Sequence, residues 1–497
     1  MSPYIDRPRE WSYLDRVLAD VRRRGQLFLI SGRRGAGKTA LVKSWLSARR
    51  KRALYWTASE HLDERDQAAD FAQALHRHLG VAPKPAGGDA GQIWTEAFAQ
   101  LAEATRTHRQ IVIIDQLTDM LKEHGAFASA LQQAWDRSLQ DLSVLLILIG
   151  EPGRRLFEHL RSYDRAPLYG RFTAIWPATP IPWSEFSIAF RQWALRDRLL
   201  AYSITGGWPA FVGGLDPKAS PRAALTRLVR APDFVQSALA VVGRVGPTRL
   251  PVVLAMLRAL AMGLASQATL ARRSRLSRRR VNAALVDLEI ADLVNTRDLP
   301  VRAPVPWTQR VVYRLVDEQV SFVFSAATSL SNTAHEALAA QALAQALAPA
   351  QRIPADGVME NLLIPWLFRA GLRNRLPGIV DDVGPLTVDL PCDSAVAAQD
   401  RSHPRVIVCG VFSQRRRVGE ARVRAFARAA RRLIQTAWPE WPGRALVVSL
   451  SGYTEKARLS RSEDDLVLMD AESLARDLAK WRQPSLIAKP KRFKIPL

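Results

Sequence analysis

The chain has 497 residues, and its 71 lysine and arginine residues exceed its 47 aspartate and glutamate residues, which gives a formal net charge of +24. Hydrophobic residues make up 48% and charged residues 24% of the chain, a balance that excludes a disordered or fibrous protein. At roughly 100–200 residues per domain, this length predicts three or four domains. The two cysteines, Cys392 and Cys409, exclude a disulfide framework and a Cys-rich zinc finger.

The positive charge comes mainly from arginine, and it favours a polyanionic partner, most often nucleic acid. A genome of high GC content, which favours arginine codons, is the alternative explanation. The first residues lack the apolar core of a signal peptide, and no window reaches about 18 uninterrupted apolar residues. We therefore expect a soluble, cytoplasmic protein without a membrane partner.

The first 180 residues alternate between short apolar runs and segments with helical periodicity. The predicted strands are Gln26–Ser31, Ala53–Thr57, Gln110–Ile114 and Val144–Ile149. Helical segments separate these strands, as in proteins whose right-handed crossovers build a mainly parallel sheet. We predict an α/β core over residues 1–180.

A second region, rich in Ala, Leu and Arg, follows Pro182 and predicts helices. We assign residues 181–245 to a helical lid and residues 246–330 to a winged helix, which is a helix-turn-helix variant. The winged helix is predicted from three helices and two strands, namely Val252–Ala261, Gln267–Arg273, Ser277–Leu288, Ala291–Asn295 and Val311–Leu315.

Residues 331–497 form the last predicted domain. Its Ala- and Gln-rich start, Ala334–Ala350, predicts a helix or a linker, and Lys489–Lys494 is a basic tail. Between them the pattern again predicts an α/β domain, with strands at Leu386–Leu390, Val406–Val411 and Ala445–Leu450.

A glycine-rich loop between the first predicted strand and the following helix fits the phosphate-loop pattern GxxxxGK[ST]. In such a loop backbone N–H groups and the positive end of the helix surround a phosphate. Lys38 can then reach the β- and γ-phosphates of ATP, and the Thr39 hydroxyl can ligate Mg²⁺. The predicted nucleotide-binding residues are Gly32, Arg33, Arg34, Gly35, Ala36, Gly37, Lys38, Thr39 and Ala40.

The apolar strand that ends at Asp115 supplies the carboxylate that such a loop needs beside Mg²⁺. Many ATPases of this architecture have Glu at the next position, but this chain has Gln116, whose amide can hold a water molecule and cannot take its proton. Three explanations are open. Hydrolysis is slow and the protein is an ATP-held switch, or Asp119 or Glu151 serves as the base instead. The third is that Gln116 was engineered to trap bound ATP. Arg171 is either an arginine finger for a neighbouring subunit or a surface cation.

These motifs together resemble the archaeal-type ATPases of the AAA+ class, which carry a winged helix and a C-terminal domain related to PD-(D/E)xK nucleases. The motifs that carry the resemblance are Ile5-Asp6-Arg7, the phosphate loop, Ile113-Ile114-Asp115, Pro167–Arg171, Gly206–Ala210 and Ser451–Thr454. The resemblance implies that Ile5 and Arg7 lie near the adenine. It also implies that Gly207 and Pro209 belong to the lid over the nucleotide.

The chain departs from that family in its C-terminal domain. The family usually carries an Asp on one strand and Glu-x-Lys on the next, which bind Mg²⁺ and activate water. Asp389 matches the first ligand, but Cys409 and Val411 stand where Glu and Lys are expected, and neither suits Mg²⁺. The resemblance therefore implies a nuclease-like fold without nuclease chemistry, and the alternative is an active nuclease that uses Asp381 or Asp382.

Six arginines lie within Ala271–Arg280, at the turn and the start of the third helix of the predicted winged helix. Ser277 is a suitable N-cap residue for that helix. In a helix-turn-helix these positions enter the major groove and contact phosphates. The predicted DNA-binding residues are Arg272, Arg273, Arg275, Arg278, Arg279, Arg280 and Asn282, with Arg302 and Arg310 as candidates in the wing. The alternative is a packing module whose basic face is only solvated.

The sequence thus favours an ATP-binding ATPase, or an ATP-held switch, that uses Mg²⁺ and forms homo-oligomers on duplex DNA. Mobile-element or defence machinery, with further protein partners, is a plausible setting. One alternative is a nucleotide-switched signalling or scaffold protein that does not bind DNA. Another is an ATP-dependent nuclease with a non-standard active site.

Overall fold

A computed structural model describes most of the chain, and its described residues divide into two compact units. The first unit comprises the described residues up to Pro180 together with Trp208–Ala210, and the second comprises Ile181–Gly207 and the described residues from Phe211 onward. The described residues are 8–59, 61–82, 87–121, 125–152, 156, 166–245, 248, 250–298, 311–327, 358–359, 362–364, 366–367, 382–386, 390–400, 403–414, 416–459 and 466–479.

The first unit is built on a parallel sheet with the strand order β2-β3-β4-β1-β5. Its strands are β1 (Gln26–Ser31), β2 (Leu54–Thr57), β3 (Gln110–Asp115), β4 (Val144–Gly150) and β5 (Ala174–Pro177). The four strands predicted from apolar runs are confirmed. The sequence prediction missed β5, an edge strand of four residues whose last residue, Pro177, cannot donate a ladder hydrogen bond and therefore weakens the strand signal.

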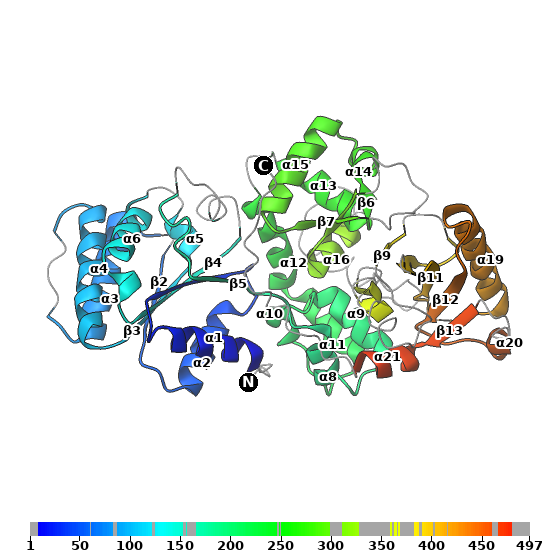
Figure 1. Cartoon of the computed structure of the whole chain (residues 1–497), viewed down its shortest axis with the longest axis horizontal. Coiled ribbons are helices and arrows are strands. Elements are labelled where there is room, and N and C mark those ends of the chain that lie inside the picture. The colour runs from blue at the N-terminus through cyan, green and yellow to red at the C-terminus, as the bar shows by residue number, and fades with distance from the viewer. Residues whose placement is uncertain are drawn as a thin grey trace. The chain divides into compact units, whose positions relative to one another are not determined.

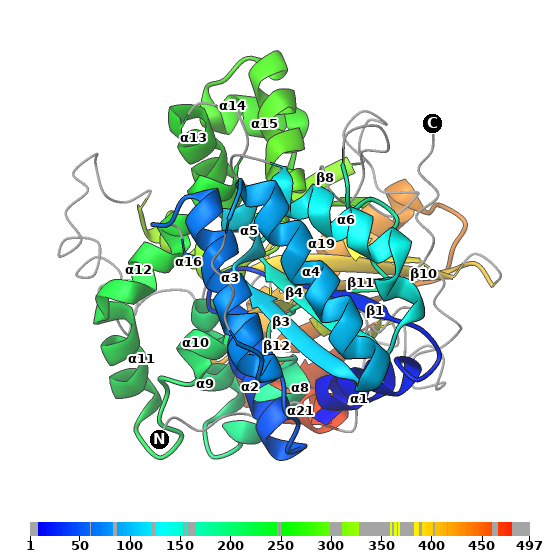
Figure 2. The same ribbon diagram turned by 90° about the vertical axis from the view of Figure 1, so that its left-hand side faces the viewer.

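Helices cover both faces of this parallel sheet (Figure 1). On one face an aromatic cluster that includes Trp56, Phe71 and Trp94 packs between the strands and helices α3, α4 and α6. These helices face the viewer in Figure 2. On the other face the ring of Tyr13 in α1 lies 5.7 Å from that of Phe28. The helices are α1 (Pro8–Asp20), α2 (Lys38–Ala48), α3 (Glu64–Leu79), α4 (Ala90–Thr107), α5 (Leu117–Met120), α6 (Ala126–Arg137) and the 3₁₀ turn η1 (Leu139–Asp141).

The second unit begins with helices. They are α8 (Trp183–Ala189), α9 (Leu195–Thr205), α10 (Pro209–Val212, which spans the unit boundary), α11 (Pro221–Arg230), α12 (Pro232–Leu239), the 3₁₀ helix η2 (Ala240–Arg244) and, later in the chain, α16 (Glu318–Ala327). The late helix α16 packs against α9 and α12. The buried Gln319 side chain of α16 donates a hydrogen bond of 2.6 Å to the Phe234 carbonyl of α12.

The next segment of the second unit contains three helices and a small antiparallel sheet of order β6-β8-β7. Its elements are α13 (Leu250–Ala261), β6 (Ala265–Ser266), α14 (Gln267–Ser274), α15 (Arg278–Ile290), β7 (Val294–Asp298) and β8 (Val311–Leu315). The predicted helices and the second strand are confirmed. The first strand begins three residues later than predicted, because Ala291 and Asp292 end α15, with a left-handed φ of 56° at Asp292.

The C-terminal sheet has the order β13-β12-β11-β10-β9, with an antiparallel β9-β10-β11 meander followed by parallel strands. Its elements are β9 (Asp382–Pro385), β10 (Ser394–Asp400), β11 (Arg405–Phe412), α19 (Glu420–Ala437), β12 (Gly443–Ser449), α20 (Glu455–Leu459), β13 (Leu466–Asp470) and α21 (Ala471–Ala479). The prediction of a strand at Leu386–Leu390 is wrong at both ends. Strand β9 ends at Pro385, although the Leu386 N–H still donates a 2.8 Å hydrogen bond to the Ala395 carbonyl of β10, and residues 387–389 lie outside the described residues.

Several predicted features lie outside the described residues, namely Ile5, Arg7, Arg302, Arg310, Asp381, Asp389, residues 334–350 and the basic tail. Within the described part of the chain, no helix combines the length and the apolar character that a membrane span requires.

Candidate nucleotide site and arginine clusters

The phosphate loop joins the carboxyl end of β1 to the start of α2, as the sequence predicts. Gly35 and Gly37 adopt left-handed φ values of 82° and 77°, a conformation that disfavours residues with a Cβ atom. Helix α2 begins at Lys38 and has no acidic residue in its first turn. Its positive end is therefore open to an anion at the loop.

Lys38 lies inside the loop that it is predicted to serve. Its side chain is buried, and its Nζ donates hydrogen bonds of 2.5 Å to the Gly32 carbonyl and 3.0 Å to the Arg33 carbonyl. The ammonium group is thus held by the backbone that surrounds the predicted phosphate position.

Asp115 and Thr39 meet at the edge of the sheet where the phosphate loop begins. The buried Asp115 carboxylate accepts a hydrogen bond of 2.6 Å from the Thr39 hydroxyl and one of 2.8 Å from the backbone N–H of Gln116. Both side chains offer oxygen atoms, the ligands that Mg²⁺ prefers. The pair therefore fits a magnesium site, in which the ion would neutralise phosphate charge.

Tyr55 is a member of this cluster that the sequence reasoning missed. Its hydroxyl, on β2, donates a hydrogen bond of 2.5 Å to the same Asp115 oxygen that Thr39 contacts. Burial, and then the Asp115 carboxylate, raise the pKa of Tyr55, so the phenol remains a donor at neutral pH. Lys43 Nζ lies 4.6 Å from the centre of the Tyr55 ring. The parallel pairing of β2 with β3 aligns the carboxyl ends of these strands, and this pairing, which the sequence does not show, brings Tyr55 to Asp115.

Gln116 follows Asp115 in a left-handed conformation, with φ of 62° and an exposed side chain. The described structure thus has an amide at the position where a general base is expected. The backbone N–H of the candidate base Glu151 donates a 2.8 Å hydrogen bond to the Thr118 hydroxyl, which fixes the end of β4 beside α5. The side chain of the other candidate base, Asp119, lies outside the described residues.

Trp208–Ala210 contacts the phosphate loop directly. The Arg33 guanidinium, which is only 4% exposed, lies 5.1 Å from the centre of the Trp208 ring, and the Gly35 carbonyl accepts a 3.2 Å hydrogen bond from Ala210 N. A Cβ atom on Gly37 would lie 3.2 Å from Pro209. The structure therefore brings Pro209 to the loop, and it adds Trp208, which the sequence reasoning quoted without assigning it a role.

Gly207 allows the chain to turn into this segment. It has a left-handed φ of 70°, and a Cβ atom there would lie 2.8 Å from both the Ile181 carbonyl and the Tyr202 ring. Any larger residue at this position would meet that backbone oxygen.

Arg171 does not lie beside the phosphate loop of its own chain. It precedes β5, next to Thr173, whose N–H donates to the Leu27 carbonyl near the amino end of β1. The phosphate loop follows the opposite end of β1, which at about 3.3 Å per residue is roughly 20 Å away. Arg171 instead forms an ion pair of 2.6 Å with Asp136.

Five of the predicted DNA-binding arginines lie exposed on α14, α15 and the turn between them. They are Arg272, Arg275, Arg278, Arg279 and Arg280. Helix α15 has no acidic residue in its first turn, where three of these cations meet the positive helix end. The repulsion between these cations and the positive helix end destabilises α15, and a bound polyanion would reduce this repulsion.

Arg273 differs from the other five arginines because it serves the fold. It is half-buried, and its guanidinium donates hydrogen bonds of 3.3 Å and 3.1 Å to the carbonyls of Ala259 and Gly263 at the end of α13. Asn282 is exposed and accepts a hydrogen bond from Gln267. Ser277 occupies the N-cap position of α15, but its side chain makes no capping hydrogen bond, contrary to expectation.

The C-terminal sheet places Cys409 and Val411 inside β11, both buried. Burial raises the pKa of the Cys409 thiol. Nearby carboxylates make structural hydrogen bonds: Asp393 accepts from Ser413, and Asp382 accepts from Gln399. Among the described residues, no group of three or more His, Cys, Asp or Glu side chains could hold a metal ion.

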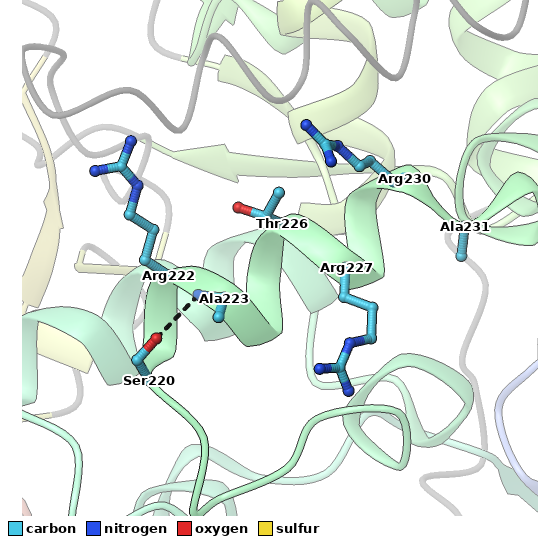
Figure 3. A pocket seen from close by; sticks show the side chains of 7 residues that line it. All are labelled: Ser220, Arg222, Ala223, Thr226, Arg227, Arg230 and Ala231. Atoms are coloured by element: carbon cyan, nitrogen blue, oxygen red, sulfur yellow. Dashed lines mark hydrogen bonds between the residues drawn. The ribbon is translucent and has the colours of Figure 1, made fainter.

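A further cluster of arginines lines a hollow of about 780 Å³ on α11 (Figure 3). In Figure 3, Arg222 and Arg230 extend on the same side of the helix as Thr226, and Arg227 extends away from them. No phosphate-loop residue lines this hollow, so we do not assign the nucleotide to it.

Comparison with known proteins supports the interpretation of the first unit. Residues 21–156 match the AAA domain. An uncharacterised protein of Methanocaldococcus jannaschii, MJECL04, is 24% identical over 209 residues, which are 42% of this chain and 43% of that protein. The chain thus spans less than half of the curated relative that it matches.

Among solved structures, the Walker-type ATPase PABY2304 of Pyrococcus abyssi aligns with a TM-score of 0.50 and 17% identity, over 65% of this chain and 96% of that chain. This likeness concerns the fold. A Cdc6 protein of Pyrobaculum aerophilum reaches only 0.33 at 14% identity, over 70% of this chain and 98% of its own, which is too low to support an argument. The domain match and the parallel sheet identify an AAA-type P-loop ATPase core, a class that binds nucleotide, usually with Mg²⁺.

The contact between Trp208 and Arg33 predicts a measurable effect on nucleotide affinity. Replacing Trp208 by Leu removes a cation–π contact, which is worth about 0.5–2 kcal/mol, and loosens the loop. We expect calorimetry to give an ATP affinity lower by roughly threefold or more, with the melting temperature used to check folding. Trp441→Leu, in the C-terminal sheet domain, is the matched control, and equal affinities in the two variants would contradict the role of Trp208.

Proposed function

We propose that the protein is an ATP-held switch: its AAA domain binds ATP with Mg²⁺, and its winged helix binds duplex DNA in an oligomeric assembly. One observation carries the nucleotide part, namely the meeting of Lys38, Thr39 and Asp115 at a phosphate loop between β1 and α2. The proposed domains are residues 1–180, 181–245, 246–330 and 331–497.

Different groups at the loop bind the phosphates, the Mg²⁺ ion and the adenine. The N–H groups of Gly32 and Ala36 donate to the Gly150 and Arg33 carbonyls, so the phosphates are assigned to other backbone N–H groups of the loop and to the first turn of α2. Lys38 leaves its two carbonyl partners to meet the β- and γ-phosphates. Thr39 and Asp115 hold Mg²⁺, and Tyr55 keeps Asp115 oriented. Ile5 and Arg7 remain proposed contacts of the adenine.

Gln116 makes this a switch that stays in its ATP state. Its amide orients the attacking water but cannot accept the proton, so hydrolysis is slow. Trp208–Ala210 contacts the loop and continues into the lid, and it therefore gives the helical lid a covalent connection to the occupied site. We propose that occupancy of the loop is reported through this segment.

The segment from α13 to β8 is proposed to be the winged helix, with α15 as its recognition helix and β7 and β8 as the wing. Three helices with a three-stranded antiparallel sheet support this assignment. The five exposed arginines of α14, α15 and their turn are proposed to supply phosphate contacts, and the exposed Asn282 is proposed to contact a base edge. Arg273 is left out of this set because it caps α13.

Oligomerisation would complete the ATP site. Arg171 is about the length of β1 away from its own loop, so its proposed role as an arginine finger is directed at a neighbouring copy. The C-terminal domain is proposed to be a nuclease-like fold that has lost its chemistry, because Cys409 and Val411 are buried in β11. Mobile-element or defence machinery, with further protein partners, remains the proposed setting.

The presence of Gln rather than Glu at position 116 predicts slow ATP turnover. Gln116→Glu supplies a general base, and we expect steady-state phosphate release to rise by about tenfold or more, since general bases contribute roughly 10²–10⁴-fold. Lys38→Ala in the same background is the control and should abolish the gain. Unchanged turnover in Gln116→Glu would mean that another residue activates water and that Gln116 does not hold the switch.

The proposed winged helix predicts salt-sensitive DNA binding. Replacing Arg278, Arg279 and Arg280 by Ala removes three phosphate contacts, so fluorescence anisotropy should give a duplex affinity lower by about tenfold or more and a shallower salt dependence. Arg77→Ala/Arg106→Ala, which removes exposed arginines from α3 and α4, is the control. If the triple variant bound DNA like the control, a switch that acts without this DNA contact would be the better interpretation.

A further inference from the structure

Helix α19 of the C-terminal domain presents a row of arginines opposite its buried face. The buried residues Val423, Phe426, Ala427, Ala430 and Ile434 pack into the core of the sheet. Figure 1 shows α19 along one side of strands β11 and β12. The outer side of the helix carries exposed side chains, namely Arg424, Arg428, Arg431 and Arg432, whereas the guanidinium of Arg422 lies 5.3 Å from the centre of the Phe412 ring and contacts Gln414. The helix is therefore held rigidly with its cations toward solvent.

The charge around α19 is strongly unbalanced. Among the described residues of 403–459, eleven side chains are arginine or lysine and three are glutamate. Glu420 pairs with Arg424 at 2.7 Å. The guanidinium groups of Arg428 and Arg432 have no hydrogen-bond or ion-pair partner among the described residues. Most of this charge is thus not neutralised by nearby acids.

This arrangement works against the stability of the helix. Arg424, Arg428 and Arg432 follow one another at intervals of four residues, and like charges at this spacing destabilise a helix. Internal pairing does not offset the repulsion at Arg428 and Arg432. A row of this kind is therefore better explained by an external polyanion than by a contribution to folding.

A cavity adjoins the arginine row at the edge of the sheet. It has a volume of about 570 Å³, and its walls include Arg405 at the start of β11, Arg444 in β12 and Arg431 of α19, with no acidic residue. Neither Arg405 nor Arg444 has a side-chain partner among the described residues. Because Arg431 belongs to both features, the row and the cavity form one surface, which we call the α19 surface.

We propose that the α19 surface binds the phosphate backbone of duplex DNA. Four residues of α-helix rise about 6 Å, so Arg424, Arg428 and Arg432 are spaced much like successive phosphates along one strand. Arginine binds phosphate through two parallel hydrogen bonds, which a rigid helix can direct. The exposed face of α19 offers no large exposed apolar side chain, which a protein partner would need at the centre of its interface.

This binding is independent of base sequence, since the surface is dominated by guanidinium groups rather than by side chains suited to base edges. The inference shares with the proposed function only the assumption that duplex DNA is the partner. It does not require the winged helix to bind DNA. The C-terminal domain thereby becomes a part that holds DNA, although its sheet lacks the residues to cut it.

The test measures anisotropy of a short labelled duplex of mixed sequence with the full-length chain, at about 50 mM and about 200 mM salt. Arg428→Ala/Arg432→Ala should lower the affinity by about tenfold at the lower salt and reduce the slope of log affinity against log salt by about two. Arg405→Ala/Arg444→Ala should also lower the duplex affinity and the salt slope, but by less. The control Arg77→Ala/Arg106→Ala should bind as the unchanged chain does.

The charge-conserving variant Arg428→Lys/Arg432→Lys checks for misfolding, and it should retain most of the affinity. The proposal would be overturned if Arg428→Ala/Arg432→Ala bound the duplex with the affinity and salt slope of the control. It would also be overturned if this variant lost affinity for a labelled single-stranded RNA but not for the duplex. A loss in the α19 variants with none in the Arg278, Arg279 and Arg280 triple variant would support the α19 surface while the proposed winged-helix contact fails. The opposite pattern would reject the α19 surface alone.

Discussion

The account depends on one contact, the 2.6 Å hydrogen bond between the Thr39 hydroxyl and the Asp115 carboxylate. The two residues are far apart in the chain, and parallel strands bring them together because their carboxyl ends share one edge of the sheet. The phosphate loop lies at the same edge, with Lys38 held by its carbonyls. The nucleotide site therefore depends on a parallel strand order in which β1 and β3 flank β4.

The fold of the first unit could be predicted largely from sequence because its strands are continuous apolar runs, as in Gln26–Ser31 and Val144–Gly150. The edge strand Ala174–Pro177 gave a weaker signal, because its apolar run is short and ends in a proline. The loop residues were predictable from their spacing. Tyr55 and Trp208 were not, because their roles depend on contacts with Asp115 and Arg33 that arise only when strands pair and the chain turns at Gly207.

Composition alone could not separate the arginines into those that serve the fold and those that face solvent. Arg33 lies against an indole, Arg171 pairs with Asp136, and Arg273 caps a helix, so each has a structural use. Among the described residues, Arg428 and Arg432 of α19 and the five exposed arginines of α14, α15 and their turn make no comparable contact, and they contribute to the unbalanced charge. A positive excess therefore becomes informative about partners only after the structural cations have been subtracted from it.

The central claim is that the loop around Lys38 binds a nucleotide triphosphate together with Mg²⁺ held at Thr39 and Asp115. Calorimetric titration of ATP into the full-length chain, with Mg²⁺ and with a chelator, tests it most directly. The account predicts saturable binding of one ATP per chain that weakens when Mg²⁺ is removed. Absence of binding heat in both buffers, for a chain shown to be folded by its melting curve, would contradict it.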